Sequence, residues 1–152
     1  MKRWHETALA ADVLQLGSGL QVSFMRTLRI PDDGRTYALP PGLGRFPLRR
    51  VDDYSGRVPR EWRRQGGVFL PMYQREALWI HFSTMNGPSA VKVGVGKVCA
   101  LTGARWSDAL HRRPQDYLVV PDQPWLDGIV VRKGVIRQFV AMPLGLGYTV
   151  EG

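Results

Sequence analysis

The sequence predicts a mainly β fold, or an α+β fold with few short helices, arranged as an antiparallel sandwich or a distorted barrel in a single domain. Seventeen glycines and eleven prolines in 152 residues interrupt the chain too often for long helices. Several segments alternate apolar and polar side chains with the period of a half-buried strand. No segment is long and amphipathic enough for the crossover helices of a parallel α/β sheet. We therefore expect six to nine strands and two or three short helices within residues 1–152.

The first quarter of the chain predicts one helix followed by one strand. Residues 4–15, WHETALAADVLQ, have acceptable helix formers, and the glycines after them would end the helix. Residues 20–25 alternate in strand period, and Pro31-Asp32-Asp33-Gly34 has the residue types of a turn.

The middle of the chain predicts a loop and a short helix. Residues 39–47, LPPGLGRFP, contain three prolines and two glycines, which predicts a loop or an extended crossing segment that Phe46 and Leu48 anchor to the core. Residues 58–67, VPREWRRQGG, predict a short helix because proline stands at its start and glycines at its end.

The second half predicts mostly strands. Residues 77–83 should form a strand packed on both faces, and residues 116–121 a buried strand. Residues 104–113 predict a short helical segment. Residues 129–142 predict a hairpin around Lys133-Gly134, and residues 148–152 start a last strand.

The fragment GVGK in the segment AVKVGVGKVCALTG could suggest a phosphate-binding loop. A loop of that kind needs glycine at position 91 and Ser or Thr at position 98, and valine stands at both. A dinucleotide fingerprint would need a small residue where Cys99 stands, followed by a helix. We therefore interpret the segment as a strand that continues across Gly94 and Gly96, which mark a bulge or a close approach of another backbone.

Composition predicts a cytoplasmic protein, because its one cysteine, Cys99, allows no internal disulfide. The N-terminus lacks the apolar core of a signal peptide, and no apolar run approaches the roughly 18 residues of a membrane span. No membrane association is expected.

The sequence contains no recognisable catalytic or metal-binding motif. It therefore does not decide whether the protein is an enzyme, but it favours a protein without enzymatic activity. His5, His81 and His111 are far apart and have no second ligand at metal-site spacing. No Gly-x-Ser-x-Gly motif is present, and Cys99 lies in an apolar strand where a thiol is unreactive. The sequence predicts no cofactor and no metal.

The densest positive charge lies in residues 45–64, in a chain of net charge +8. This segment has seven arginines against three acids, with aromatic residues interleaved, a composition suited to an anion or a single-stranded nucleic acid. The simpler interpretation is that the arginines pair with the acids on a solvated face. The candidate binding residues are Arg45, Arg49, Arg50, Arg60, Arg63 and Arg64.

A second candidate site combines His81 with the segment PDQPWLDGI, in which Trp125 and Asp127 could line a ligand pocket. The commoner roles of such residues are structural, because a loop tryptophan usually anchors the loop in the core.

Five segments together resemble a group of uncharacterised bacterial hypothetical proteins. These segments are RTLRIPDDGRTYALPPGLGRFPL, YQREALW, AVKVGVGKV, QDYLVVPDQPWLDGI and RQFVAMPLGLGYTVEG. The resemblance implies no activity, cofactor or site residue. It does imply that related chains are usually longer, so that this chain would be either the N-terminal part of a longer architecture or a natural short version.

The leading functional hypothesis is a non-enzymatic binding or interaction module for a protein or an anionic ligand. The alternative is a sequence-independent nucleic-acid binder that uses residues 45–64, and a third hypothesis is an enzyme with His81, Trp125 and Asp127 at its site. Exposed strand edges would favour self-association.

Overall fold

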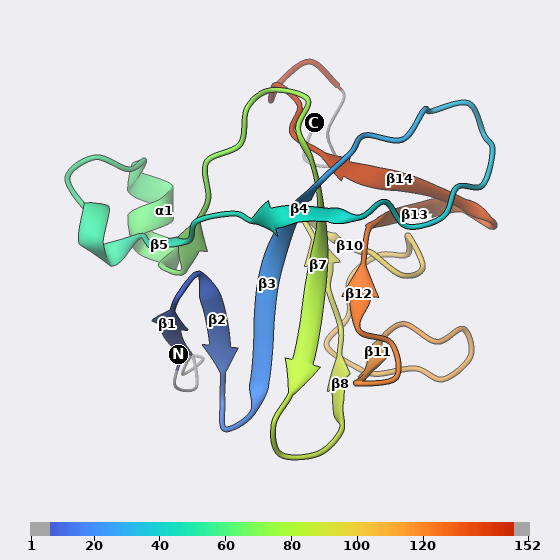
Figure 1. Cartoon of the computed structure of the whole chain (residues 1–152), viewed down its shortest axis with the longest axis horizontal. Coiled ribbons are helices and arrows are strands. Elements are labelled where there is room, and N and C mark those ends of the chain that lie inside the picture. The colour runs from blue at the N-terminus through green and yellow to red at the C-terminus, as the bar shows by residue number, and fades with distance from the viewer. Residues whose placement is uncertain (1–6, 148–152) are drawn as a thin grey trace.

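A large antiparallel sheet forms the centre of the computed structural model, which describes residues 7–147 (Figure 1). Its spatial order is β1 (Thr7–Ala10), β2 (Val13–Leu16), β3 (Leu20–Thr27), β7 (Ala77–Thr84), β14 (Val135–Val140) and β13 (Gly128–Arg132), with β12 (Trp125–Leu126) paired to β7 and β4 (Gly42–Arg45) paired to β3. The terminal strands β1 and β13 do not pair with each other, so the sheet is open. The predicted mainly β, antiparallel fold is confirmed, and the barrel alternative is wrong.

The described residues also form three two-stranded sheets and two short helices. The small sheets pair β10 (Val98–Cys99) with β9 (Gly94–Val95), β11 (Leu118–Val120) with β8 (Ser89–Val91), and β5 (Arg49–Arg50) with β6 (Val68–Phe69). The helices are the 3-10 helix η1 (Asp52–Tyr54) and α1 (Arg60–Gln65). Between residues 7 and 147, no helix has the length and apolar character that crossing a membrane would require.

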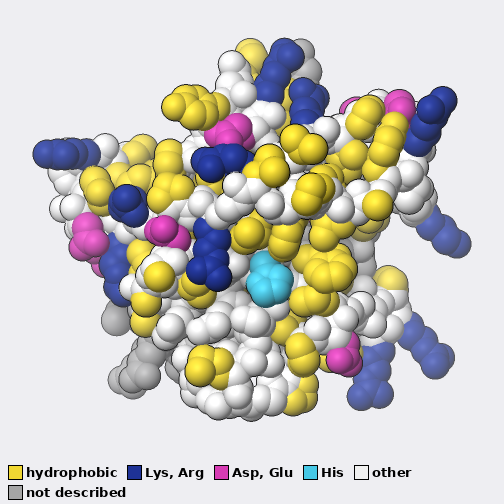
Figure 2. All heavy atoms as spheres, in the orientation of Figure 1, with side chains coloured by type: hydrophobic (Ala, Val, Ile, Leu, Met, Phe, Trp, Pro, Cys, Tyr) yellow, Lys and Arg dark blue, Asp and Glu magenta, His cyan; other side chains and the backbone are white. Residues whose placement is uncertain are grey.

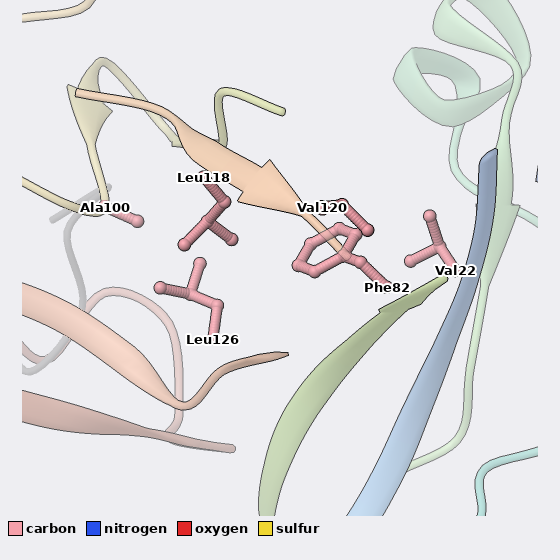
Figure 3. Close-up of a cluster of buried hydrophobic side chains, with 6 residues drawn as sticks. All are labelled: Val22, Phe82, Ala100, Leu118, Val120 and Leu126. Carbon is pink, nitrogen blue, oxygen red and sulfur yellow. The ribbon is translucent and has the colours of Figure 1, made fainter. Parts of the chain in front are cut away.

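The main core lies between the large sheet and the β8–β11 pair. Figure 3 shows Val22 of β3, Phe82 of β7 and Leu126 of β12 together with Leu118 and Val120 of β11. The β3–β7 pairing supports this core, because it runs in continuous register from Leu20↔Thr84 to Thr27↔Ala77. Alternate residues of two long paired strands share a face, so the apolar positions predicted from residues 20–25 and 77–83 meet on one side.

The helix predicted over residues 4–15 is wrong for the part that the structure describes. Residues 7–16 instead form the β1–β2 hairpin, closed by the pair Ala10↔Val13. Its two-residue turn places Ala11 at φ 51° and Asp12 at φ 62°, the left-handed conformation that such hairpins require. The Asp12 carboxylate also accepts a hydrogen bond from the Leu48 backbone N–H at 3.0 Å, and this long-range contact outweighs the helix propensity of the alanines.

The sequence predicted a loop or an extended crossing segment over residues 39–47. Part of it is a regular strand instead, because β4 pairs with the end of β3. The prolines lie outside the strand, and the pairing tolerates Gly44 through a register shift between Met25 and Thr27. The predicted anchoring is confirmed: Phe46 is fully buried and Leu48 is 2% exposed.

The GVGK segment is not one continuous strand. β8 ends at Val91, and the chain then turns back at Gly96 (φ 58°), which joins β9 to β10. Gly94 marks a close approach of a side chain and not of the predicted second backbone, since a Cβ there would lie 2.9 Å from the Trp106 ring. No helix follows the glycines in this hairpin, which agrees with the prediction that the segment is not a phosphate-binding loop.

The short helix predicted over residues 104–113 does not form. The Cys99 N–H donates to the Ala104 carbonyl at 2.8 Å, and the Trp106 N–H donates to the Lys97 carbonyl at 2.8 Å. Arg105 forms a bridge with Val98. The backbone groups of residues 104–106 are therefore paired with the β9–β10 region rather than with the next turn of a helix, and Arg112 forms a bridge with Gln115.

The other elements agree with the structure in position, but the expected six to nine strands are too few, since the described residues form fourteen, several of them only two or three residues long. α1 begins directly after Pro59 and ends before Gly66, β11 lies within residues 116–121, and the β13–β14 hairpin turns at Lys133-Gly134. The strand predicted over residues 148–152 lies outside the described residues.

Candidate functional site

Residues 49–69, which we call the arginine lobe, form an excursion from the sheet that is closed at its base. β5 and β6 pair through Arg49↔Phe69 and Arg50↔Val68, and the Val51 N–H donates to the Gly67 carbonyl at 3.0 Å. This closure brings η1 and α1 next to β6. In Figure 1 the lobe projects beyond the sheet at the left of the view.

Three aromatic rings of the arginine lobe line an apolar cleft of about 440 Å³. The ring of Phe69 lies 5.5 Å from that of Tyr54 in an edge-on arrangement and 5.5 Å from that of Trp62. Pro59 and the guanidinium-bearing side chains of Arg49 and Arg57 also line this aromatic cleft. Its volume lies within the range of small-ligand and side-chain pockets.

The arginines of the lobe have no acidic partner within it among the described residues. No ion pair joins them to Asp52, Asp53 or Glu61 in the part of the chain that the structure describes, so the pairing expected under the simpler interpretation does not occur there. Within residues 7–147, Arg49 is the one arginine of the lobe that approaches a carboxylate, with its Nη1 3.8 Å from Asp12 Oδ1. Figure 2 shows Lys and Arg side chains beside hydrophobic ones over α1 and β5.

Of the six arginines predicted from the sequence, one lines this cleft. Arg49 lines it, and the other predicted arginines are exposed on β4, β5 and α1, namely Arg45, Arg50, Arg60, Arg63 and Arg64. Sequence reasoning did not select Phe69, which is far from Tyr54 and Trp62 in the chain and joins them through the β5–β6 pairing. Phe46, counted as an interleaved aromatic residue, is buried and cannot stack on a ligand.

The second predicted set, His81, Trp125 and Asp127, is partly brought together. Trp125 is the cross-strand partner of His81, and the Trp79 ring lies 6.2 Å from the His81 ring on the same strand. Trp125 is 50% exposed, so it does not anchor its loop in the core, which is the commoner role of a loop tryptophan. Asp127 connects β12 to β13, and its carbonyl accepts from the Phe139 N–H at 2.9 Å. A ligand pocket on this face stays a prediction.

One charged cluster, which we call the Lys92 cluster, was not predicted. Lys92 Nζ lies 2.7 Å from Asp116 Oδ2, and their side chains are only 7% and 9% exposed. His111 Nδ1 lies 2.7 Å from the same carboxylate oxygen. The three residues are separated in sequence by up to 24 positions, and no local pattern indicates that they meet.

The comparisons with known proteins supply no relative from which a role could be inferred. No family model matches the chain, and neither the curated proteins nor the solved structures contain a match. The fold defines a mainly β protein with an open antiparallel sheet, and any assignment of function rests on the geometry of its surface clefts.

Proposed function

We propose that the protein is a non-enzymatic binding module that takes up an acidic peptide segment of a partner protein in the aromatic cleft. One observation carries the proposal: an apolar cleft lined by three aromatic rings lies within a lobe whose arginines have no acidic partner inside that lobe, among the residues described. An apolar side chain of the partner would enter the cleft, and carboxylates beside it would meet the guanidinium groups.

The chemistry of the cleft favours this occupant. Tyrosine, tryptophan and arginine are the residue types that contribute most to binding at protein interfaces. Trp62 is 42% exposed, so contact with a partner can bury a large part of its ring. The lobe has six arginines against three acids, and this charge steers an acidic segment toward it.

Replacement of Trp62 by alanine tests the proposal. The probe is a fluorescently labelled short peptide with a central Trp or Leu flanked by glutamates, and binding is measured by fluorescence anisotropy. We expect W62A to weaken binding about tenfold or more, as loss of a central aromatic contact does. Arg57→Ala should weaken it less and reduce its salt dependence.

Matched controls separate the cleft from general surface effects. Tyr73→Ala removes an aromatic side chain that is 82% exposed and does not line the cleft, so its affinity should equal that of the wild type. A peptide with lysine in place of every glutamate should not bind. Equal affinity of the wild type and W62A for the acidic peptide would refute the proposal.

The same rings and arginines favour a second candidate function, the binding of single-stranded nucleic acid. Aromatic faces can stack on bases while arginines contact phosphates. For this candidate we expect affinity for a short oligothymidylate that falls steeply between about 50 and 200 mM salt, with a shallower salt slope in Arg63→Ala/Arg64→Ala. Undetectable binding at low salt, or an unchanged slope in the double variant, would exclude it.

A further inference from the structure

A second depression, of about 210 Å³, lies over the Lys92 cluster and is independent of the aromatic cleft. The buried Lys92 and Asp116 form its floor. His111, Ser107 and two arginines, Arg105 and Arg113, also line it. What this depression can bind follows from the hydrogen-bonding capacity that remains after the internal bonds are counted.

The floor is fully paired. Lys92 Nζ donates to Asp116 Oδ2 at 2.7 Å, to the Ala109 carbonyl at 2.6 Å and to Ser107 Oγ at 3.4 Å, which uses its three hydrogens. Asp116 Oδ1 accepts from the His111 backbone N–H at 2.8 Å, and Oδ2 accepts from Lys92 and from the His111 ring. The negative charge of Asp116 is therefore matched by Lys92 and is not directed at the depression.

The groups left over are donors. Ser107 Oγ accepts from Lys92, so its own hydrogen is available to a ligand. Among the residues that the structure describes, no carboxylate forms an ion pair with Arg105 or Arg113. Two guanidinium groups and one hydroxyl around a small depression are the donor types that bind oxyanions.

His111 links the depression to pH. Its Nδ1 faces a carboxylate, which can only accept, so Nδ1 carries a hydrogen and Nε2 is the atom that gains or loses a proton. The side chain is 55% exposed. The charged groups that line the depression with it are Lys92, Asp116, Arg105 and Arg113. Asp108, three positions before His111 in the chain, accepts from the Trp106 indole N–H at 3.0 Å.

We propose that this depression binds a phosphate-sized oxyanion through Arg105, Arg113 and the protonated imidazole of His111. The neutral imidazole presents a lone pair at Nε2 and repels an anion, whereas the imidazolium donates a charge-assisted hydrogen bond. Oxyanion binding is therefore coupled to uptake of a proton by His111. The ligand class is a phosphate group, either free or carried by a larger molecule.

Sulfate is the first probe, because its charge does not change between about pH 5.5 and about 7.5, across which histidine titrates. We expect saturable sulfate binding, measured by calorimetry and by shifts of the His111 ring NMR signals, that is about tenfold tighter at the lower pH. His111→Gln should abolish that pH dependence. Arg105→Gln/Arg113→Gln should weaken binding about tenfold or more at both pH values, without lowering the melting temperature, since both side chains are exposed.

Arg132→Gln is the matched control, because Arg132 is exposed on β13 and does not line the depression. Titrations with inorganic phosphate and with a phosphoserine peptide distinguish the source: tighter binding of the peptide indicates a phosphate carried by a larger molecule, and equal binding indicates a free oxyanion. Absence of saturation with all three probes, or wild-type affinity in the Arg105/Arg113 double variant, would overturn the proposal. Failure of the acidic peptide at the aromatic cleft would leave these results unaffected, since the sites share no residue.

Discussion

Phe46→Ala is expected to lower the free energy of unfolding by about 3–5 kcal/mol, the range for truncating a buried aromatic side chain. The ring is fully buried although it follows a strand whose own residues are all exposed. Its backbone N–H donates to the Phe24 carbonyl at 2.8 Å, and the Arg26 guanidinium lies 4.4 Å from the centre of the ring. Thermal and urea denaturation measure the loss, which should correspond to a melting temperature about 10 °C lower.

Leu43→Ala is the matched control, because Leu43 lies in β4, the short strand that Phe46 follows, and is 53% exposed. Its effect should stay within about 0.5 kcal/mol. If the two variants were equally stable, Phe46 would not anchor the segment between β4 and the arginine lobe. Phe46→Leu should lose much less than Phe46→Ala, since it keeps most of the buried volume.

The sequence predicts best the elements that are fixed by local patterns. The β13–β14 hairpin has two apolar runs joined at Lys133-Gly134, and α1 has Pro59 before it and Gly66 after it. In both cases the residues that determine the element are its immediate neighbours in the chain. The β3–β7 pair is predictable for a related reason, because each strand alternates in period two and both apolar faces need the same core.

The errors arise where distant contacts override local propensity. Residues 7–10 are rich in alanine, but they pair with β2 across a turn that the Asp12 carboxylate ties to the Leu48 N–H. The segment 104–106 has its backbone groups bonded to residues 97–99 instead of to its own next turn. Propensity is a weak guide at such positions, since a hydrogen bond to a distant strand satisfies the backbone equally well.

The candidate sites also divide into those that local sequence predicts and those that depend on contacts between distant residues. The arginine-rich segment is visible in the sequence because its members are close together, and the aromatic residues Tyr54 and Trp62 lie among them. Phe69 and the Lys92 cluster are not visible, since each depends on strand pairing that brings distant residues together. β8 pairs with β11 through Leu118↔Val91, and this pairing places Lys92, next to Val91, within 2.7 Å of Asp116.

Asp116→Ala is expected to lower the melting temperature at neutral pH on the order of 10 °C, because it leaves the Lys92 ammonium buried without its counter-charge. It also removes the acceptor of the His111 backbone N–H. The control is Lys92→Met/Asp116→Leu, which buries no charge and should regain part of the lost stability. A double variant that melts at or below the temperature of Asp116→Ala would show that the buried charge is not the cause.

The pH dependence of stability provides an independent check on the same contacts. The bond from the His111 backbone N–H, followed by that from Lys92, holds the pKa of the Asp116 carboxyl well below its usual range. Because the folded pKa is lower than the unfolded value of about 3.9, the stabilisation is complete above about pH 5 and is lost as the pH falls toward the folded pKa. The difference in melting temperature between the wild type and Lys92→Met/Asp116→Leu should therefore change in favour of the double variant as the pH falls below about 4. A difference that stays constant down to about pH 3 would mean that Asp116 is not stabilised as a carboxylate in the folded protein.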